Sequence, residues 1–226
     1  MKYQNIKIAK FIDRPNRFIA NIEIDGEKKI CHVKNTGRCK ELLSSGTNVW
    51  VEHIKSPNRK TEYDLVCVEK DGEYINIDSQ APNKIFKEWA QNSGHFGDDV
   101  TIRSEVKYKN SRFDFYIESG NRKIFTEVKG VTLKSGDVAL FPDAPTERGV
   151  KHINELSECI KDGYEAQIVF IIQMKGVNLF SPNNATHPQF GISLKEAEKN
   201  GVGIMAIDCN VTPDEVVARK FIEVSI

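Results

Sequence analysis

The chain has 226 residues, of which 39% are hydrophobic and 28% charged, and its formal net charge is zero. These values are typical of a globular protein. The longest apolar run, residues 168–172, is far shorter than the roughly 20 residues that span a bilayer, and residues 1–5 lack the apolar core of a signal peptide. The sequence therefore argues against a membrane protein and favours a cytoplasmic protein with one large domain or two small ones.

The placement of charges and cysteines further limits the kinds of domain and site that the chain can contain. Residues 1–60 contain 13 Lys and Arg against 6 Asp and Glu, whereas residues 61–226 contain 19 against 26. Such asymmetry indicates either a basic module attached to a second part or an ordinary solvated basic face. The five cysteines are odd in number and none has CxxC spacing, which favours buried reduced thiols over a disulfide framework or a zinc site.

The first 80 residues read as a series of short strands. Alternation and turn signals, including Asp25-Gly26, predict strands over residues 7–12, 17–24, 29–33, 48–54 and 61–68. Residues 35–43 fit a short helix that ends near Gly46. Three strands, a short helix and two strands is the order of an OB-like β-barrel, a fold that often binds single-stranded nucleic acid or oligosaccharides. Lys55, Arg59 and Lys60 lie in the loop that would line its binding face.

The remaining residues alternate between helices and strands. A boundary at residues 79–82 precedes the first predicted helix, so we expect domains at 1–80 and 81–226. The second domain is predicted to contain helices at 83–93, 146–161 and 193–200, with strands at 105–108, 112–117, 124–129, 167–174 and 202–208. This order predicts a mixed α/β sheet in which the apolar strand 167–174 is central.

The hairpin over residues 112–129 carries the strongest chemical signal. A two-residue loop at Gly120-Asn121 pairs residues whose numbers sum to 241, which places Asp114 opposite Glu127, with Lys129 on the same face. Like charges directly opposite one another are destabilising. A divalent cation would remove that repulsion, and Mg²⁺ is commonly held by one or two carboxylates. We therefore expect Mg²⁺ or Mn²⁺ at Asp114 and Glu127, with the Val128 carbonyl as a further ligand.

Asp114, Glu127 and Lys129 together match the Asp-x(n)-Glu-x-Lys pattern of restriction-endonuclease-like, PD-(D/E)XK, domains. In that reading the three are catalytic, and Lys129 orients the attacking water and stabilises charge on the phosphate. Glu105 and Glu88 are rival candidates for a third carboxylate. The alternative is a solvated hairpin edge without chemistry.

A second candidate lies at the start of the helix over residues 146–161. Thr146 is placed to cap the helix, and Arg148, Lys151 and His152 fall in its first two turns. A helix N-terminus with such residues can hold a phosphate. The alternative is an ordinary set of i,i+4 ion pairs on a solvated helix.

Several stretches give the chain a resemblance to the sugar fermentation stimulation protein A (SfsA) family. They are residues 17–20 (RFIA), 35–38 (NTGR), 110–115 (NSRFDF), 127–133 (EVKGVTL) and 141–152 (FPDAPTERGVKH). The resemblance implies an N-terminal OB-like domain, a C-terminal nuclease-like domain, non-specific DNA binding and a regulatory role in sugar (maltose) metabolism. Arg17 and Arg38, within two of these stretches, join the candidate nucleic-acid contacts.

Two functions remain open from the sequence. One is a Mg²⁺-dependent deoxyribonuclease that hydrolyses phosphodiester bonds and holds its strand with the OB domain. The other is a DNA-binding regulator whose nuclease-like domain is catalytically idle. A third option, an OB module for an oligosaccharide, is suggested only by the family's name.

Overall fold

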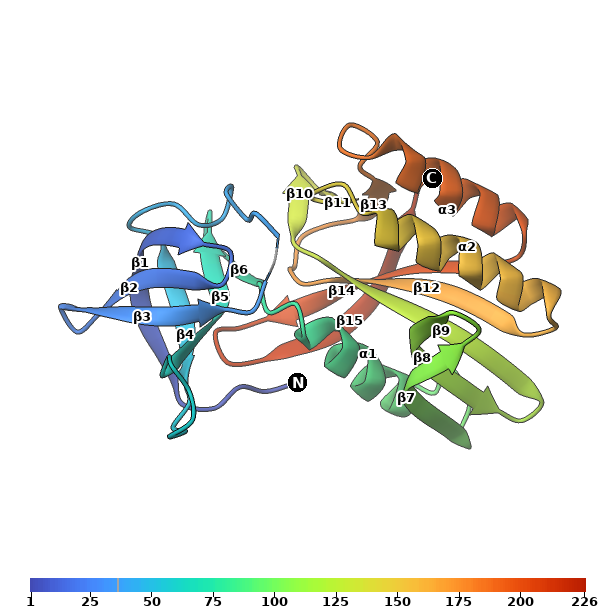
Figure 1. Ribbon diagram of the computed structural model, residues 1–226, viewed down its shortest axis with the longest axis horizontal. Helices are drawn as coiled ribbons and strands as arrows, with labels where there is room; N and C mark the ends of the chain where they lie inside the picture. The colour runs from blue at the N-terminus through green and yellow to red at the C-terminus, as the bar shows by residue number, and fades with distance from the viewer. Residues whose placement is uncertain (36) are drawn as a thin grey trace.

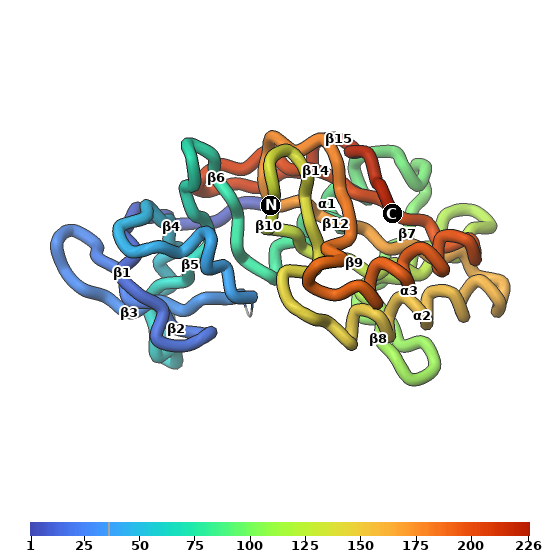
Figure 2. Tube along the Cα trace, turned by 90° about the horizontal axis from the view of Figure 1, so that it is seen from above, coloured from blue at the N-terminus to red at the C-terminus, as the bar shows by residue number. Residues whose placement is uncertain are grey.

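The computed structural model describes residues 1–35 and 37–226. The chain forms a β-barrel followed by an α/β domain, and the two lie side by side (Figure 1). The same division is visible when the molecule is turned by 90° (Figure 2). The predicted two-part fold is therefore confirmed.

The N-terminal domain contains six strands. They are β1 (Ile6–Asn16), β2 (Ile19–Ile24), β3 (Glu27–Val33), β4 (Asn48–His53), β5 (Tyr63–Lys70) and β6 (Glu73–Asn76). β1 pairs with β2 and β4, and β3 pairs with β5, so five strands close on themselves while β6 extends from β5. Asp25 and Gly26 both have positive φ, 54° and 79°, as a type I′ hairpin turn requires.

The predicted helix over residues 35–43 is wrong as far as the structure describes it; Thr36 lies outside the described residues. Leu42 and Leu43 both donate to the Cys39 carbonyl in a single turn. Cys39 has a left-handed φ of 46°, which interrupts a right-handed helix. The Arg14 guanidinium also donates to the carbonyls of Gly37 and Arg38 at 2.9 and 3.0 Å, groups that a helix would have used internally.

The α/β domain contains three helices and nine strands among the described residues. The helices are α1 (Ala81–Asn92), α2 (Glu147–Lys161) and α3 (Pro188–Lys199). The strands are β7 (Val100–Tyr108), β8 (Ser111–Ser119), β9 (Arg122–Val131), β10 (Leu133–Ser135), β11 (Val138–Phe141), β12 (Glu165–Ile172), β13 (Leu179–Pro182), β14 (Gly203–Val211) and β15 (Val216–Val224).

The nine strands form one mixed sheet in the order β10-β11-β13-β15-β14-β12-β9-β8-β7. β12 pairs in parallel with β9 and β14, and it is buried at every position but its first. α1 covers one face, and α2 and α3 cover the other (Figure 1). The apolar cores on the two faces enclose β12, so the strand expected to be central is central.

The state of the cysteines and the apolarity of the helices also follow from the structure. All five cysteines are buried and free, consistent with the predicted reduced thiols. Within the described parts of the chain, no helix is both long and apolar enough to cross a membrane.

Candidate active site on β8 and β9

The hairpin register agrees with the sequence prediction. Phe115 pairs with Thr126, Tyr116 with Phe125 and Ile117 with Ile124, so each pair of numbers sums to 241. Gly120 has a φ of 57°, the positive value required at the first position of a type II′ turn. The loop therefore fixes which residues of β8 and β9 meet.

The backbone pairing between β8 and β9 ends at Phe115, just before Asp114. Beyond that point, the Asp114 carboxylate accepts the hydrogen bond of a β9 amide in place of a β8 carbonyl. Oδ2 accepts a hydrogen bond from the Val128 amide at 2.8 Å, and Oδ1 accepts one from Asn83 Nδ2 at 2.9 Å. A strand residue directs its amide and carbonyl to the same neighbour. The Val128 carbonyl is therefore directed toward the side on which Asp114 lies.

A change of face in β8 accompanies this break. Residues two apart in a regular strand share a face. Phe113 instead packs near His152 of α2, with ring centroids 6.2 Å apart, while Phe115 packs on Phe86 of α1 at 5.2 Å. The switch falls on Asp114, so its carboxylate turns into the gap between the strands.

Glu127 is the most enclosed member of the site, with only 2% of its surface exposed. Its Oε1 is bound by Lys129 Nζ at 2.5 Å and by His152 Nδ1. Its other oxygen, Oε2, is buried and has no hydrogen-bond partner among the residues the structure describes. A buried carboxylate oxygen without a partner is energetically costly, so Oε2 is an oxygen that a bound group could stabilise.

The two carboxylates have pKa values displaced in opposite directions. Burial and the negative charge of Glu127 raise the pKa of Asp114. Burial would also raise the pKa of Glu127, but the hydrogen bond from His152 and the charge of Lys129 lower it overall. Asp114 is therefore the member of the pair whose negative charge is less favourable without a cation.

Neither rival third carboxylate reaches this pair. Glu105 pairs with Arg112 at 2.8 Å on the surface, and Glu88 binds the N-terminal amine at 2.5 Å. No cluster of three or more His, Cys, Asp or Glu side chains able to hold a metal occurs within residues 1–35 and 37–226. The protein groups that could coordinate a metal here are therefore the carboxylates of Asp114 and Glu127 and the Val128 carbonyl.

The start of α2 serves the site more directly than the sequence suggested. Thr146 caps the helix by accepting from the Gly149 amide at 3.1 Å. His152 is buried, with its Nε2 3.5 Å from Arg148 Nε. These contacts indicate that Nδ1 donates to Glu127 while Nε2 accepts. The sequence places His152 among the candidate nucleic-acid contacts, because its spacing from Arg148 does not reveal its contact with Glu127, which lies 25 residues earlier.

In the barrel, one half-buried cation, Arg14, organises the loops that carry Arg17 and Arg38. The guanidinium of Arg14 donates to the carbonyls of Arg17 at 2.6 Å and Asn35 at 2.5 Å, as well as to those of Gly37 and Arg38. The exposed side chains of Arg17 and Arg38 therefore project from loops tied to a single group. Sequence reasoning did not single out Arg14.

Arg59 differs from its neighbours in the basic loop. Its guanidinium binds the carboxylate of Asp64, which is only 2% exposed. Lys55 and Lys60 are exposed. Of the three residues predicted to contact nucleic acid from this loop, Arg59 therefore has a structural partner.

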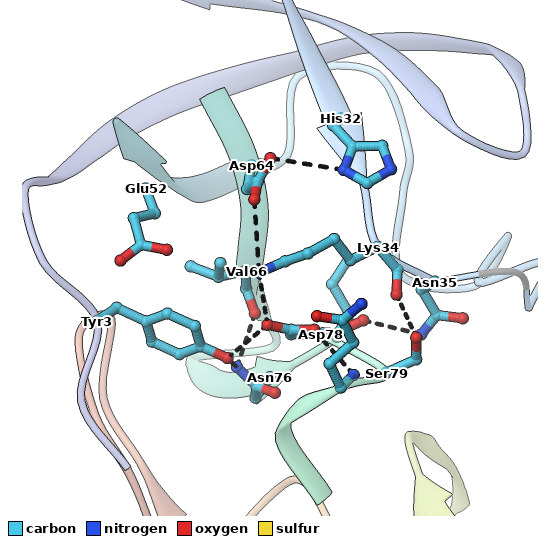
Figure 3. Close-up of polar contacts among 12 residues, drawn as sticks. Tyr3, His32, Lys34, Asn35, Glu52, Asp64, Val66, Asn76, Asp78 and Ser79 are labelled. Carbon is cyan, nitrogen blue, oxygen red and sulfur yellow. Dashed lines mark hydrogen bonds and ion pairs between the residues drawn. The ribbon is translucent and has the colours of Figure 1, made fainter. Parts of the chain in front are cut away.

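Asp64 belongs to a polar network where the barrel meets the linker (Figure 3). Lys34 lies between two buried carboxylates, with its Nζ 3.5 Å from Asp64 and 2.8 Å from Asp78. Tyr3 donates to Asp78 at 3.2 Å. Each charge has an opposite partner, so the network is a structural junction.

The same network reaches the α/β domain. Gln173, just after β12, donates to the Asn76 side chain at 2.6 Å and to the Asp78 carbonyl at 3.0 Å. The Asn76 amide in turn donates to the Gln173 carbonyl at 2.9 Å. Buried polar bonds therefore fasten the barrel to the strand beside β9.

The barrel domain as a whole carries little excess positive charge. The excess of positive charge lies within residues 1–60, whereas the barrel and its linker run to residue 80. Residues 1–80 contain 14 Lys and Arg against 12 Asp and Glu. Two of those acids, Asp64 and Asp78, are buried at the junction. The barrel is therefore close to neutral.

Comparison with known proteins gives one consistent answer. The model of the SfsA N-terminal OB domain matches residues 12–77, and the model of the sugar fermentation stimulation protein RE domain matches residues 80–215. A sugar fermentation stimulation protein homolog of Desulfitobacterium hafniense (strain DSM 10664 / DCB-2) is 57% identical over 226 residues, covering 100% of this chain and 99% of the relative. The homolog of Ruminiclostridium cellulolyticum is 54% identical over 224 residues, covering 99% of each.

A solved structure is also similar along the whole chain. It is described as the structure of Pyrococcus furiosus SfsA in complex with Ca²⁺. The TM-score is 0.91 at 30% sequence identity, and the match covers 100% of this chain and 98% of the other.

Proposed function

The chain belongs to the sugar fermentation stimulation protein family, and from that premise we propose that it binds DNA with little sequence preference and hydrolyses phosphodiester bonds with Mg²⁺ or Mn²⁺. Asp114 and Glu127 would hold the ion, with the Val128 carbonyl as a third protein ligand. Lys129 would act on the phosphate.

One observation carries this proposal. Both donors that reach Glu127 bind the same oxygen, Oε1, and leave Oε2 buried without a partner among the described residues. A carboxylate that served only an ion pair would gain by sharing its donors between both oxygens. The observed arrangement instead fixes Oε1 with two donors and leaves Oε2 available to coordinate a cation.

The residues present fit a hard cation. Two carboxylates and a carbonyl supply oxygen donors, and Mg²⁺ usually keeps several waters and takes substrate phosphate oxygens for the rest of its shell. Ca²⁺ also takes oxygen ligands. The Pyrococcus furiosus relative is described as a Ca²⁺ complex, which supports a cation site in this family.

The chain's own groups have separable tasks. His152 and Lys129 fix the orientation of Glu127 through Oε1. Lys129 is 18% exposed at its side chain, so its ammonium can also reach a phosphate that enters from solvent. A bound cation would supply Lewis acidity and lower the pKa of a water. Lys129 would stabilise the charge that develops on the phosphate.

Cleavage assays test this proposal. Wild-type protein is incubated with single-stranded, duplex and branched DNA in Mn²⁺, beside a Lys129→Ala variant. We expect the wild type to cleave at least one substrate, and Lys129→Ala to lose cleavage while keeping metal and DNA binding, because Lys129 contacts Oε1 rather than Oε2. Equal cleavage by both proteins would place the activity elsewhere.

A second function is favoured by one observation. The described residues include no third acidic or histidine side chain positioned to complete a metal site. A non-catalytic DNA-binding regulator of genes for sugar (maltose) metabolism would need none. DNA binding by the wild type, without cleavage of any of the three substrates, would support this alternative.

A further inference from the structure

We propose that the α/β domain carries its own phosphate-binding groove for nucleic acid, formed by Lys107, Arg112, Arg148 and Lys151. This basic groove adjoins Glu127. The inference rests on the proposed function, because it specifies where the DNA backbone is held.

The groove lies between the end of β7, the start of β8 and the first two turns of α2. Its lining consists of Asn110, Ser111 and His152 together with the four cations of the basic groove. Among the described residues that line it, no side chain is acidic. Asn110 and Ser111 add polar groups that can donate to phosphate oxygens.

Such clustering is not what the composition of this domain would produce by itself. Residues 81–226 contain 18 Lys and Arg against 20 Asp and Glu, so the average surface is slightly acidic. Four cations around one hollow therefore stand out from it. A concave surface lined by one sign of charge concentrates ligands of the opposite sign.

The partners of these cations are weak enough to be exchanged. Arg112 pairs with Glu105 at 2.8 Å, with both side chains more than half exposed. Lys151 lies 3.8 Å from Glu155. Exposed ion pairs typically contribute only about 0–1 kcal/mol, so a DNA phosphate can compete for these cations.

His152 connects the basic groove to the active site. Its ring lines the groove, while its Nδ1 binds Glu127 Oε1. One side chain therefore separates the groove from the carboxylate proposed to hold the cation. A DNA strand seated on the four cations would pass directly beside the proposed reaction centre.

The barrel offers less free charge than its sequence suggests. Arg14 is bound to four carbonyls, Lys34 to Asp78 and Arg59 to Asp64. These cations stabilise the protein itself. Lys55 and Lys60 remain exposed in the barrel, so the barrel can add phosphate contacts to those of the basic groove.

The test compares two variants with the same change in net charge. The groove variant is Lys107→Gln, Arg112→Gln and Lys151→Gln, which leaves Arg148 in place beside His152. The control is Lys123→Gln, Lys195→Gln and Lys199→Gln, three exposed cations outside the groove. Affinity for labelled single-stranded and duplex oligonucleotides is measured in EDTA across a salt series, with circular dichroism and urea unfolding to confirm that both variants fold.

Each phosphate contact contributes about 0.7 to the slope of log affinity against log salt for single strands and about 0.9 for duplex. We expect the groove variant to lose a slope of about 2 to 3, and the control to keep the wild-type slope. An unchanged slope in the groove variant would overturn the inference. Equal losses in both variants would also overturn it, because net charge alone would then explain the effect.

Failure of the groove and failure of the proposed function give different results. If the wild type binds and cleaves DNA but the groove variant keeps its salt slope, only the groove is wrong. If the wild type binds neither oligonucleotide at low salt, the DNA-binding function is wrong and the groove falls with it.

Discussion

Replacing Asp114 by asparagine should stabilise the protein when no cation is present, and should leave it less stable than the wild type when a cation is bound. The substitution removes one of two neighbouring negative charges and keeps the side-chain shape. The oxygen of the new amide could still accept from the Val128 amide, and the Asn83 amide could flip so that its oxygen accepts from the new amide nitrogen. The change therefore isolates charge from packing.

The magnitude follows from the site. Cross-strand side-chain pairs change stability by about 0.2–1 kcal/mol, and like charges directly opposite one another destabilise. One kcal/mol shifts the melting temperature of a protein of this size by about 2–4 °C, so Asp114→Asn should gain up to about 4 °C in EDTA. In Mn²⁺ at about 100 times its dissociation constant, the wild type should gain about 2.7 kcal/mol and the variant little. The order of stability should then invert.

The pH dependence has a defined sign. A raised pKa at Asp114 means that the folded state favours the protonated acid, so wild-type stability falls as pH rises through that pKa. The lowered pKa of Glu127 acts the other way and is common to both proteins. In EDTA, the advantage of Asp114→Asn should grow as pH rises through the Asp114 pKa and shrink as acid protonates Asp114.

Differential scanning fluorimetry at several pH values, with EDTA or Mn²⁺, measures both effects. Asp99→Asn, in an exposed loop, controls for the loss of one negative charge. If Asp114→Asn were less stable than the wild type in EDTA and responded equally to Mn²⁺, Asp114 and Glu127 would not form a cation site.

Two further substitutions test the surroundings of the site. Arg59→Gln should destabilise the protein by roughly 1–3 kcal/mol, because it removes a partner of the buried Asp64 carboxylate. The controls Lys55→Gln and Lys60→Gln should stay within about 0.5 kcal/mol of wild type in urea unfolding. Equal effects of all three substitutions would contradict a structural role for Arg59. Gly130→Ala should destabilise by about 1–3 kcal/mol, because its Cβ would lie 2.5 Å from Gln173 Oε1 and 2.6 Å from Pro82 Cγ. Gly203→Ala, whose nearest contact is 3.4 Å, is its control, and equal stability of the two would show that the contacts around Gly130 give way.

Much of the architecture could be predicted because local signals agreed with the fold. The Asp25-Gly26 and Gly120-Asn121 turns set hairpin registers by themselves. β15 was not foreseen because it fits the sheet through tertiary pairing between β14 and β13. The turn at Cys39 was misassigned because a guanidinium more than 20 residues earlier takes the carbonyls of that loop.

The candidate site was predictable in part for the same reason. Asp114, Glu127 and Lys129 lie on one hairpin, so the hairpin register already brings the first two near one another. His152 reaches Glu127 from α2, and Asn83 reaches Asp114 from α1. Contacts between elements far apart in the chain leave no periodic signal. Sequence therefore predicted the carboxylates and Lys129, but not the contacts of His152 and Asn83 that orient the carboxylates.

The most direct test of a cation on Glu127 is a crystal soaked in Mn²⁺ and measured for anomalous scattering. We predict a single strong peak about 2.0–2.2 Å from Glu127 Oε2, with an Asp114 oxygen and the Val128 carbonyl also in its shell. Lys129 and His152 should remain on Oε1. Absence of a peak between Asp114 and Glu127 at saturating Mn²⁺ would contradict the proposed metal site.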